Sequence, residues 1–271
     1  MRPFPLPHPE ASVFARLEQE LSRWRGAGRI ATLWWRDDDA VSPTGALDRL
    51  LRLAGPVPLA LAVIPALAEP ALARHLAHCS GVTVIQHGWR HTNHAIPPGK
   101  KIELASRPVA TILAELIEGR RRLAELFGPA FRPVLTPPWN RIDPALVPLL
   151  AEAGFSGLST AGARKTRLAA AGLGQVNTHV DPVDWHGGRG CRDAAAVIDD
   201  LVRHLAARRT GQADAAEPTG ILTHHLVLDE ATERLLTGVL TVVEGHPAAS
   251  WVRIETAINQ ASKAPTLWAS A

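Results

Sequence analysis

"RIATLWWRDDDA", residues 29–40, places a short apolar segment directly before three adjacent aspartates. The apolar part predicts a buried strand over residues 29–35, and the aspartates fall where that strand ends. Three adjacent carboxylates repel one another, so they are costly at a buried strand end unless a cation or hydrogen-bond donors offset their charge. A solvated acidic turn is the alternative. We favour a strand that delivers carboxylates to a functional site.

The same arrangement recurs along the chain, where segments of strand length alternate with amphipathic helical segments. Polar clusters follow the predicted strands: "RDDD" (36–39), "QHGWRH" (86–91), "TPPWN" (136–140), "DPVDW" (181–185) and "LTHH" (222–225). The alternation predicts a parallel sheet with right-handed crossovers, and about seven such units close most naturally into an α/β barrel. Because the carboxyl ends of the strands share one face of a parallel barrel, we expect the five clusters to meet there.

Several element boundaries follow from local signals. The first nine residues contain four prolines and predict an extended arm. A helix over 42–55 is expected to begin with Ser42 as N-cap and Pro43 at the first helical position. Residues 143–154 are expected to be helical, and residues 251–256 to form the last strand. We therefore expect an N-terminal arm and helix over 1–28, a barrel over 29–258 and a C-terminal tail over 259–271.

Composition excludes several classes of protein. A chain of 271 residues with 46% hydrophobic residues suits one large domain. A formal net charge of +3, taken as evenly spread, does not favour a nucleic-acid partner. The longest apolar run, residues 57–68, falls short of the roughly 20 residues that cross a membrane. No secretory signal is recognised, and Cys79 and Cys191 form no paired motif. We expect a cytoplasmic protein, and the oligomeric state stays open.

The histidines after the strand at 82–87 are candidate metal ligands. His87 and His91 lie four residues apart, and neutral imidazole is the commonest nitrogen ligand of zinc. Such a pair alone also occurs in loops without metal. His94 is either a third ligand or a pocket-lining residue, and we favour the second. Two imidazoles with one carboxylate from "DDD" would leave open positions on a metal, which is typical of a catalytic site.

In their order along the chain, these five motifs resemble the polysaccharide deacetylase family, carbohydrate esterase family four, over about residues 30–255. The resemblance implies a distorted, incompletely closed (β/α) barrel. It implies a metal-dependent hydrolase that deacetylates an N-acetylated sugar or polysaccharide, with carbohydrate as partner. It also implies that Asp39, His87 and His91 hold a divalent metal, most simply Zn²⁺, although Co²⁺ or Fe²⁺ would suit these ligands.

The resemblance assigns further roles to the first motif. Asp38 is the expected base and Asp39 the ligand, because Ala40 then takes the place of the small residue that follows the pair in the family. The alternative register makes Asp37 the base and Asp38 the ligand. Because neighbouring residues of a strand point to opposite sides, one aspartate can face the metal and the next the reacting carbon.

The later motifs imply the remaining catalytic groups. In the family, the backbone N–H of the aromatic residue at the position of Trp139 stabilises the oxyanion. The general acid would be His224, oriented by Asp184, and His225 is the neighbour that competes for the acid's role.

Two departures from the family's motifs stand out. Gly88 replaces the hydroxyl residue of the second motif. The arginine of the third motif, which braces the catalytic carboxylates in the family, is missing here, and Arg36 or Arg141 would have to substitute. Two other functions remain open. One is a small-molecule amidohydrolase acting on a cyclic ureide or another N-acyl compound, which the missing export signal favours. The other is a non-catalytic carbohydrate-binding relative, which the missing arginine favours.

Overall fold

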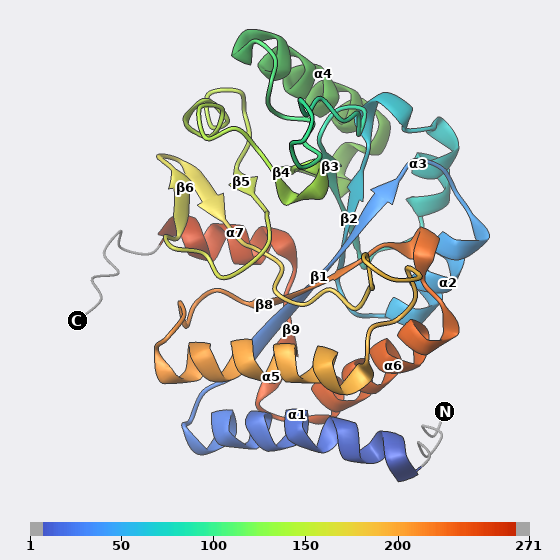
Figure 1. The fold of residues 1–271 in the computed structure, drawn as a ribbon, viewed down its shortest axis with the longest axis vertical. Coiled ribbons are helices and arrows are strands. Elements are labelled where there is room, and N and C mark those ends of the chain that lie inside the picture. The colour runs from blue at the N-terminus through green and yellow to red at the C-terminus, as the bar shows by residue number, and fades with distance from the viewer. Residues whose placement is uncertain (1–7, 264–271) are drawn as a thin grey trace.

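The computed structural model describes residues 8–263 as a β-sheet flanked by helices (Figure 1). The strands are β1 (Ala31–Ala40), β2 (Leu59–Val63), β3 (Val82–His87), β4 (Phe131–Thr136), β5 (Gly157–Leu158), β6 (Leu168–Ala170), β7 (Leu173–Gln175), β8 (Thr219–Thr223) and β9 (Ala249–Trp251). The α-helices are α1 (His8–Gly26), α2 (Gly45–Ala54), α3 (Pro70–Leu76), α4 (Val109–Phe127), α5 (Ala194–Thr210), α6 (Glu230–Gly245) and α7 (Ile254–Lys263). Short 3₁₀ helices are η1 (Pro65–Leu67), η2 (Gly128–Ala130), η3 (Pro138–Asn140), η4 (Val147–Leu149) and η5 (His225–Val227).

The strands form one sheet in the order β6-β7-β5-β4-β3-β2-β1-β8, and β9 also pairs with β1. Neighbouring strands are parallel except β6 and β7. No ladder joins β8 to β6 within residues 8–263, so hydrogen bonds do not close the sheet. The expected fold, a distorted and incompletely closed (β/α) barrel with a mostly parallel sheet, is confirmed.

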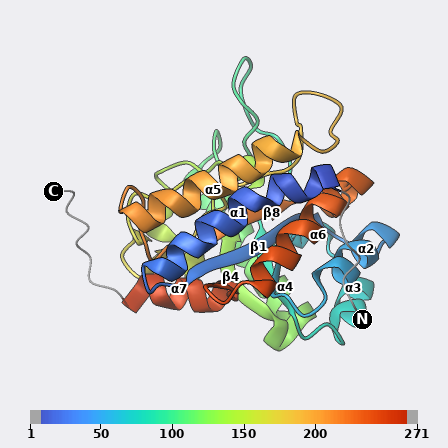
Figure 2. The ribbon, with the colours of Figure 1, turned by 90° about the horizontal axis from the view of Figure 1, so that it is seen from below.

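The central strands are buried on both faces, as parallel strands covered by other elements usually are. Trp34 and Trp35 of β1 are both buried but belong to different clusters of the core. Trp35 packs in the cluster that includes residues of α1, α5 and α6, whereas Trp34 packs with Ala257 and Ile258 of α7. Helix α1 lies against α5 and α6 outside the sheet (Figure 2). The two faces of β1 therefore point into two separate parts of the core.

Some predicted elements differ from the structure. Thr44, not Ser42, caps α2, because the Thr44 side chain accepts a hydrogen bond from the N–H of Leu47. Residues 143–154 form turns around η4 instead of an α-helix, because Pro148 has no N–H for the helical ladder. The last predicted strand, 251–256, is also wrong, since β9 ends at Trp251 and α7 begins at Ile254.

The predicted extended arm over residues 1–9 lies outside the described residues, except for positions 8 and 9, which begin α1. The predicted division into an arm with a helix, a barrel and a tail stays a prediction. Helix α7 runs through the expected boundary at residue 258.

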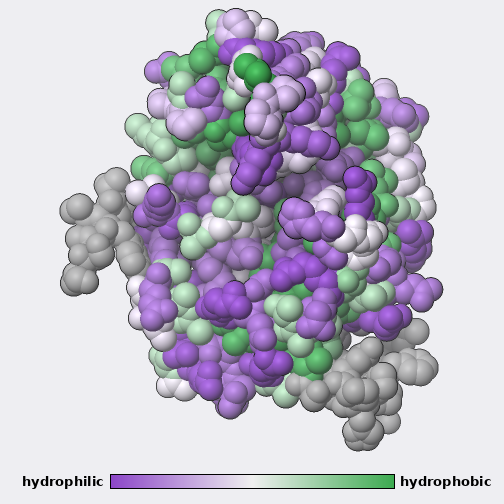
Figure 3. Space-filling view, in the orientation of Figure 1, coloured by the Kyte–Doolittle hydropathy of each residue, from purple (hydrophilic) through white to green (hydrophobic). Residues whose placement is uncertain are grey.

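The carboxyl ends of β1, β3, β4 and β8 carry four of the five polar clusters. Two loops, around residues 92–100 and 184–190, project from one face of the molecule (Figure 2). Hydrophilic side chains gather on the face between these loops (Figure 3). The parallel sheet thus places the polar clusters together, as the sequence predicts.

Candidate metal centre

Asp39, His87 and His91 meet at the carboxyl ends of β1 and β3. Oδ1 of Asp39 lies 3.1 Å from Nε2 of His87 and 3.4 Å from Nε2 of His91. One potential ligand atom from each residue lies within 4.8 Å of the other two, and His94 does not belong to the group. The structure therefore brings together the three predicted metal ligands and leaves out His94.

The hydrogen bonding of His87 indicates what this group can bind. Nδ1 of His87 lies 3.1 Å from the carbonyl oxygen of Thr136, and a carbonyl can only accept, so Nδ1 carries the proton in the neutral ring. Nε2 then presents a lone pair to Oδ1 of Asp39, which is buried and has no hydrogen-bond donor. Two facing lone pairs repel unless a proton or a cation lies between them. A backbone carbonyl that fixes the ring in this way is typical of metal-bound histidines, so the donor set fits a divalent cation.

The charges of the three residues are strongly coupled. Burial opposes ionisation of Asp39. When His87 is protonated, however, its Nε2–H faces Asp39, and this hydrogen bond, the charge of His87 and the charge of His91 together outweigh burial and lower the pKa of Asp39. Burial lowers the pKa of His87, but the charge of Asp38 and the hydrogen bond to Asp39 outweigh burial and raise it. Burial and the charge of His87 lower the pKa of His91. The carboxylate form of Asp39, which a metal requires, is therefore strongly favoured.

A bulge in β1 separates the three aspartates. Side chains alternate along β1, so Arg36 and Asp38 share one face while Asp37 belongs to the other. The pairing of β1 with β2 shifts between Asp37 and Ala40, and Asp39 adopts a left-handed conformation with φ of 75°. This local distortion turns Asp39 towards the histidines instead of leaving it on the face of Asp37.

Asp38 forms a buried, two-point ion pair with Arg36. Nε of Arg36 lies 2.9 Å from Oδ1 of Asp38, and Nη2 lies 3.0 Å from Oδ2. Nη2 also donates to Oδ1 of Asn140 at 2.7 Å, and Nη1 donates to Oγ of Ser159 at 2.9 Å. Arg141 instead donates to the carbonyl of Lys101. Of the two candidate substitutes for the missing arginine, the geometry selects Arg36.

Asp37 is enclosed behind the site. Its Oδ1 accepts from Nδ1 of His225 at 2.6 Å, and its Oδ2 accepts from the hydroxyl of Thr223 at 2.7 Å. Both Asp37 and His225 are buried. Burial lowers the pKa of His225, but its hydrogen bond to Asp37 outweighs burial and raises it. This geometry favours the register with Asp38 as base and Asp39 as ligand, because both oxygens of Asp37 already accept hydrogen bonds from His225 and Thr223.

Glu103, which the sequence analysis missed, holds the loop that carries His91. Its buried carboxylate accepts from the backbone N–H groups of Trp89, Arg90 and Thr92, at 3.0, 2.7 and 3.2 Å. A Cβ on Gly88 would lie 2.1 Å from Oε2 of Glu103, and Gly88 has a φ of 54°. Only glycine fits there, which explains the departure from the family's second motif. Glu103 is the only carboxylate between positions 92 and 114 of the sequence, a weak signal that could have identified it.

The remaining predicted residues surround this centre. The Trp139 ring lies 4.4 Å from the His91 ring, and the His224 ring contacts Trp185 edge-on at 4.7 Å. Nδ1 of His224 is buried without a hydrogen-bond partner. Asp184 accepts instead from the backbone N–H groups that follow it, at residues 186 and 187. No hydrogen bond joins Asp184 to His224 in the described part of the chain, so the expected orienting contact is not formed.

A second group of possible ligands lies elsewhere. His179, His204 and Glu217 also place ligand atoms within 4.8 Å of one another. The two imidazole rings stack with centroids 3.4 Å apart, and Nε2 of His179 lies 3.4 Å from Oε2 of Glu217. The hydroxyl of Thr219, the first residue of β8, lies 2.9 Å from Nδ1 of His204. This group therefore lies at the end of β8 opposite to His224.

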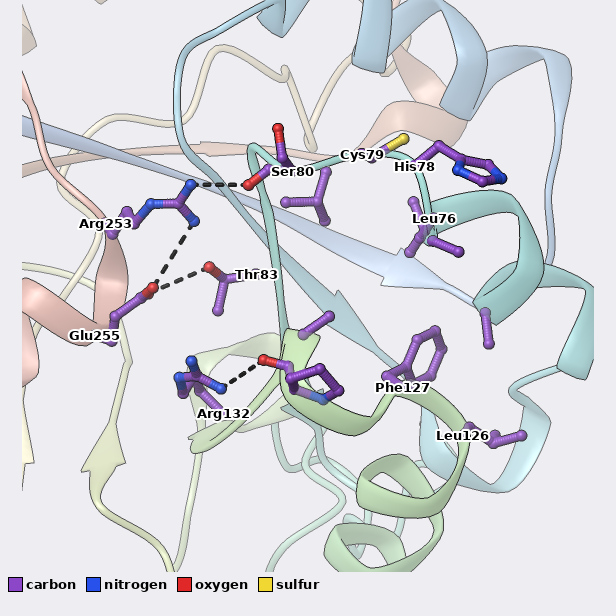
Figure 4. A pocket seen from close by; sticks show the side chains of 15 residues that line it. Leu76, His78, Cys79, Ser80, Thr83, Leu126, Phe127, Arg132, Arg253 and Glu255 are labelled. Carbon is purple, nitrogen blue, oxygen red and sulfur yellow. Dashed lines mark hydrogen bonds and ion pairs between the residues drawn. The ribbon is translucent and has the colours of Figure 1, made fainter.

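A cavity of about 510 Å³ also lies away from the candidate metal centre (Figure 4). Val82 and Thr83 of β3 and Arg132 of β4 line it, so it lies near the amino ends of these strands. Several of its polar groups are paired with one another: Thr83 donates to Glu255, and Arg253 donates to the carbonyl of Ser80 (Figure 4). The cavity does not contain the predicted site residues.

The fold is that of the family 4 carbohydrate esterases and of related deacetylases. An acetyl xylan esterase of that family from Clostridium thermocellum, solved with a cobalt ion, has a TM-score of 0.51 and 13% identity over 84% of this chain and 90% of that chain. A peptidoglycan deacetylase from Bacillus subtilis has a TM-score of 0.51 and 14% identity over 85% and 91%. Puue allantoinase has a TM-score of 0.57 and 15% identity over 85% and 89%. No family model and no curated protein matches the sequence. At these identities the likeness concerns the fold.

No helix within residues 8–263 has both the length and the apolar character that crossing a membrane requires.

Proposed function

We propose that the protein is a metal-dependent hydrolase that removes the acetyl group from an N-acetylated sugar. The observation that carries the proposal is the convergence of Asp39, His87 and His91, with the lone pairs of His87 and Asp39 facing each other. The fold it shares with an acetyl xylan esterase and a peptidoglycan deacetylase supports the choice of substrate.

Asp39, His87 and His91 would hold the metal, most simply Zn²⁺, with Co²⁺ or Fe²⁺ also compatible with one carboxylate and two imidazoles. When bound, the metal supplies a Lewis acid for the acyl oxygen and lowers the pKa of water towards about 7. In the neutral ring, the hydrogen bond to the Thr136 carbonyl places the proton of His87 on Nδ1 and leaves the metal-facing nitrogen with a lone pair. The hydrogen bonds to Glu103 fix the loop that carries His91.

Asp38 takes the proton of the attacking water. Arg36 positions both oxygens of Asp38 and offsets its buried charge, as the arginine of the third motif does in the family. Because Arg36 fills that role from within β1, the missing arginine no longer favours a protein without catalysis.

Trp139 and His224 complete the proposed reaction. The backbone N–H of Trp139 stabilises the oxyanion, a contribution of roughly 3–4 kcal/mol for a well-placed donor. His224 gives a proton to the departing amine. Asp184 fixes the turn after Val183 through its hydrogen bonds, and the neighbouring Trp185 packs against His224. We propose that Asp184 acts on His224 through this packing.

Acetate release and metal analysis test the proposal together. Asp38→Asn should abolish acetate release from N-acetylated oligosaccharides and keep the metal, whereas His87→Ala should lose both. Asp48→Asn, on α2, is the matched control and should keep both. Full activity in Asp38→Asn would show that either the register or the chemistry is wrong.

A small-molecule amidohydrolase is the second candidate, favoured by the TM-score of 0.57 with an allantoinase. The same residues would then hydrolyse a cyclic ureide or another soluble N-acyl compound. A panel that compares soluble cyclic ureides with N-acetylated sugars separates the two functions. A deacetylase should show the higher kcat/KM for the N-acetylated sugars, whereas an amidohydrolase should show the higher kcat/KM for the cyclic ureides.

A further inference from the structure

The charge around the proposed site is uneven, although the net charge of the chain is only +3. Residues 88–102, 137–142 and 185–190 form the loops beside the candidate metal centre. They contain five cations, Arg90, Lys100, Lys101, Arg141 and Arg189, and the carboxylates Glu103, Asp143 and Asp184 stand directly at their borders. Arg141 is half-buried and the other four are exposed.

Three of these cations, Lys101, Arg141 and Arg90, belong to the loops that carry His91 and Trp139. Nζ of Lys101 lies 6.0 Å from the centre of the Trp139 ring, which itself lies 4.4 Å from the His91 ring. Nη1 of Arg141 donates to the carbonyl of Lys101 at 2.8 Å and ties the two loops together. Arg90 directly precedes His91 in the chain. A positive surface therefore begins one aromatic ring away from the metal centre.

Arg189 belongs to the loop on the other side of the site. Its N–H bonds to the carbonyl of Asp184 at 3.1 Å, next to Trp185, whose ring contacts His224. The loops on both sides of the proposed site, towards His91 and towards His224, thus each contain cations.

The five cations have no acidic partner: within residues 8–263, none of them forms an ion pair. The acids that border these loops already accept hydrogen bonds from nearby donors. Asp143 accepts from the N–H of residue 145, and Asp181 accepts from Nε1 of Trp185. By contrast, Arg121 on α4 pairs with two glutamates of its own helix. The loops beside the site have cationic charge left over for a ligand.

We propose that the substrate carries an anionic group, a phosphate or a carboxylate, close to its N-acyl group. This rests on the proposed function and adds the charge of the substrate to it. The acyl group occupies the metal centre, while the anionic group faces Lys101, Arg141 and Arg90. Clustered cations raise the local concentration of an anion and its rate of association, and they stabilise the bound anion as point charges.

The kinetic test compares three sugars on the metal-loaded protein: N-acetylglucosamine 1-phosphate, an N-acetylated amino-uronic acid and neutral N-acetylglucosamine. At low ionic strength, kcat/KM for the anionic sugars should exceed that for the neutral sugar by about tenfold or more. The excess should shrink at about 0.3 M salt, because screening shortens the range of the charges to a few ångströms. The anionic sugar with the higher kcat/KM identifies the group as phosphate or carboxylate.

The double variant Lys100→Gln/Lys101→Gln should lower the ratio of anionic to neutral kcat/KM about fivefold, since exposed charges contribute about 1 kcal/mol or less each. Lys165→Gln, an exposed lysine beside Arg164, is the matched control and should leave the ratio unchanged. Equal kcat/KM for neutral and anionic sugars at low salt, or an unchanged ratio in the double variant, would overturn the proposal.

Calorimetric binding separates this proposal from the proposed function. If the metal-loaded protein hydrolyses none of the three sugars, the proposed function fails, but the sugar phosphate should still bind more tightly than the neutral sugar. Binding of the sugar phosphate that is no tighter than that of the neutral sugar, or that is insensitive to salt, would overturn the charge inference independently of turnover.

Discussion

Residues 8–263 contain two clusters of histidines and a carboxylate that are alike in residue type but differ in which histidine nitrogen carries the proton. In the first cluster, His87 donates from Nδ1 to a carbonyl and turns a lone pair towards Asp39. In the second, Nδ1 of His179 accepts from the N–H of Gly220 at 2.9 Å, so a neutral ring carries its proton on Nε2. The nitrogen that carries this proton lies 3.4 Å from Oε2 of Glu217, so the two groups attract each other without a cation between them.

The surroundings of the second cluster also disfavour a metal. Arg208 donates to the hydroxyl of Thr219, which also contacts His204. The positive guanidinium of Arg208 therefore lies close to the cluster and would repel a divalent cation bound there. Burial, together with the charges of His179 and Arg208, lowers the pKa of His204 to about 2. The comparison teaches that hydrogen bonds at the far nitrogen, more than the number of ligands, distinguish a metal site from a polar core.

The number of metal ions bound per chain is the strongest test of the difference between the two clusters. His91→Ala should weaken metal binding by at least about 100-fold, because one of only three protein ligands is lost. His204→Ala should leave one metal per chain. Elemental analysis after dialysis at pH 7.5 measures both. Two metals per wild-type chain, with one lost in His204→Ala, would show that the second cluster also binds metal.

The two clusters each have a buried arginine nearby, and substitution of these arginines should have different effects. Arg36→Lys keeps a positive charge but loses the two-point contact with Asp38, so kcat should fall by about 100-fold with little change in KM. Arg208→Lys, the matched change beside the second cluster, should lower the free energy of unfolding and leave kcat within about twofold. Equal losses of kcat in both variants would indicate that Arg36 is only structural.

Substitution of the buried glutamates Glu103 and Glu217 should have a smaller effect on metal affinity. Glu103→Gln removes the charge that fixes the loop of His91, so metal affinity should fall by about tenfold, as for other groups that orient metal ligands. Glu217→Gln should reduce stability, because it weakens bonds to the N–H groups of Arg164 and Asn177, but it should not change metal affinity. Competition titration with a chelating dye measures the affinities, and a tenfold loss in Glu217→Gln would contradict the assignment.

The pH dependence of stability tests the second cluster without a substitution at the first. Burial is the main cause that lowers the pKa of both His179 and His204 below the ordinary value of 6.5. The unfolded chain therefore binds protons first as the pH falls, so the free energy of unfolding should drop below about pH 6.5, by up to about 1.4 kcal/mol per pH unit for each histidine.

Urea unfolding of the metal-free protein between pH 7.5 and 5 measures this slope. His204→Gln should reduce the slope, and His78→Gln, a change at an exposed histidine of the α3–β3 connection, should not. A slope that is unchanged in His204→Gln would show that the second cluster does not control the acid sensitivity.

Much of the fold and half of the site could be predicted because their signals are local. Apolar segments that end in polar clusters predicted β1, β3, β4 and β8. The spacing of His87 and His91 made both imidazoles candidate metal ligands. The helix expected over 143–154 failed because Pro148 outweighs the apolar periodicity. These signals need only a few neighbouring residues.

The rest depends on contacts between residues distant in sequence. The ion pair of Arg36 with Asp38 was one of two options, because sequence alone does not show which arginine is buried. Glu103 was missed because its partners are backbone N–H groups, which have no sequence signature. The contact of Asp184 with His224 was expected from family resemblance, but the turn after Asp184 uses that carboxylate instead.

The pairing of Arg36 with Asp38 inside one strand has a consequence for redesign. Arg36 and Asp38 lie two residues apart in β1. The proposed base, Asp38, therefore has its positively charged partner on the same strand and does not need an arginine from a distant part of the chain. The loop after β4 contributes only the amide of Asn140 to this pair. Exchange of that loop, with Asn140 and the backbone at Trp139 retained, should therefore leave the orientation of Asp38 unchanged.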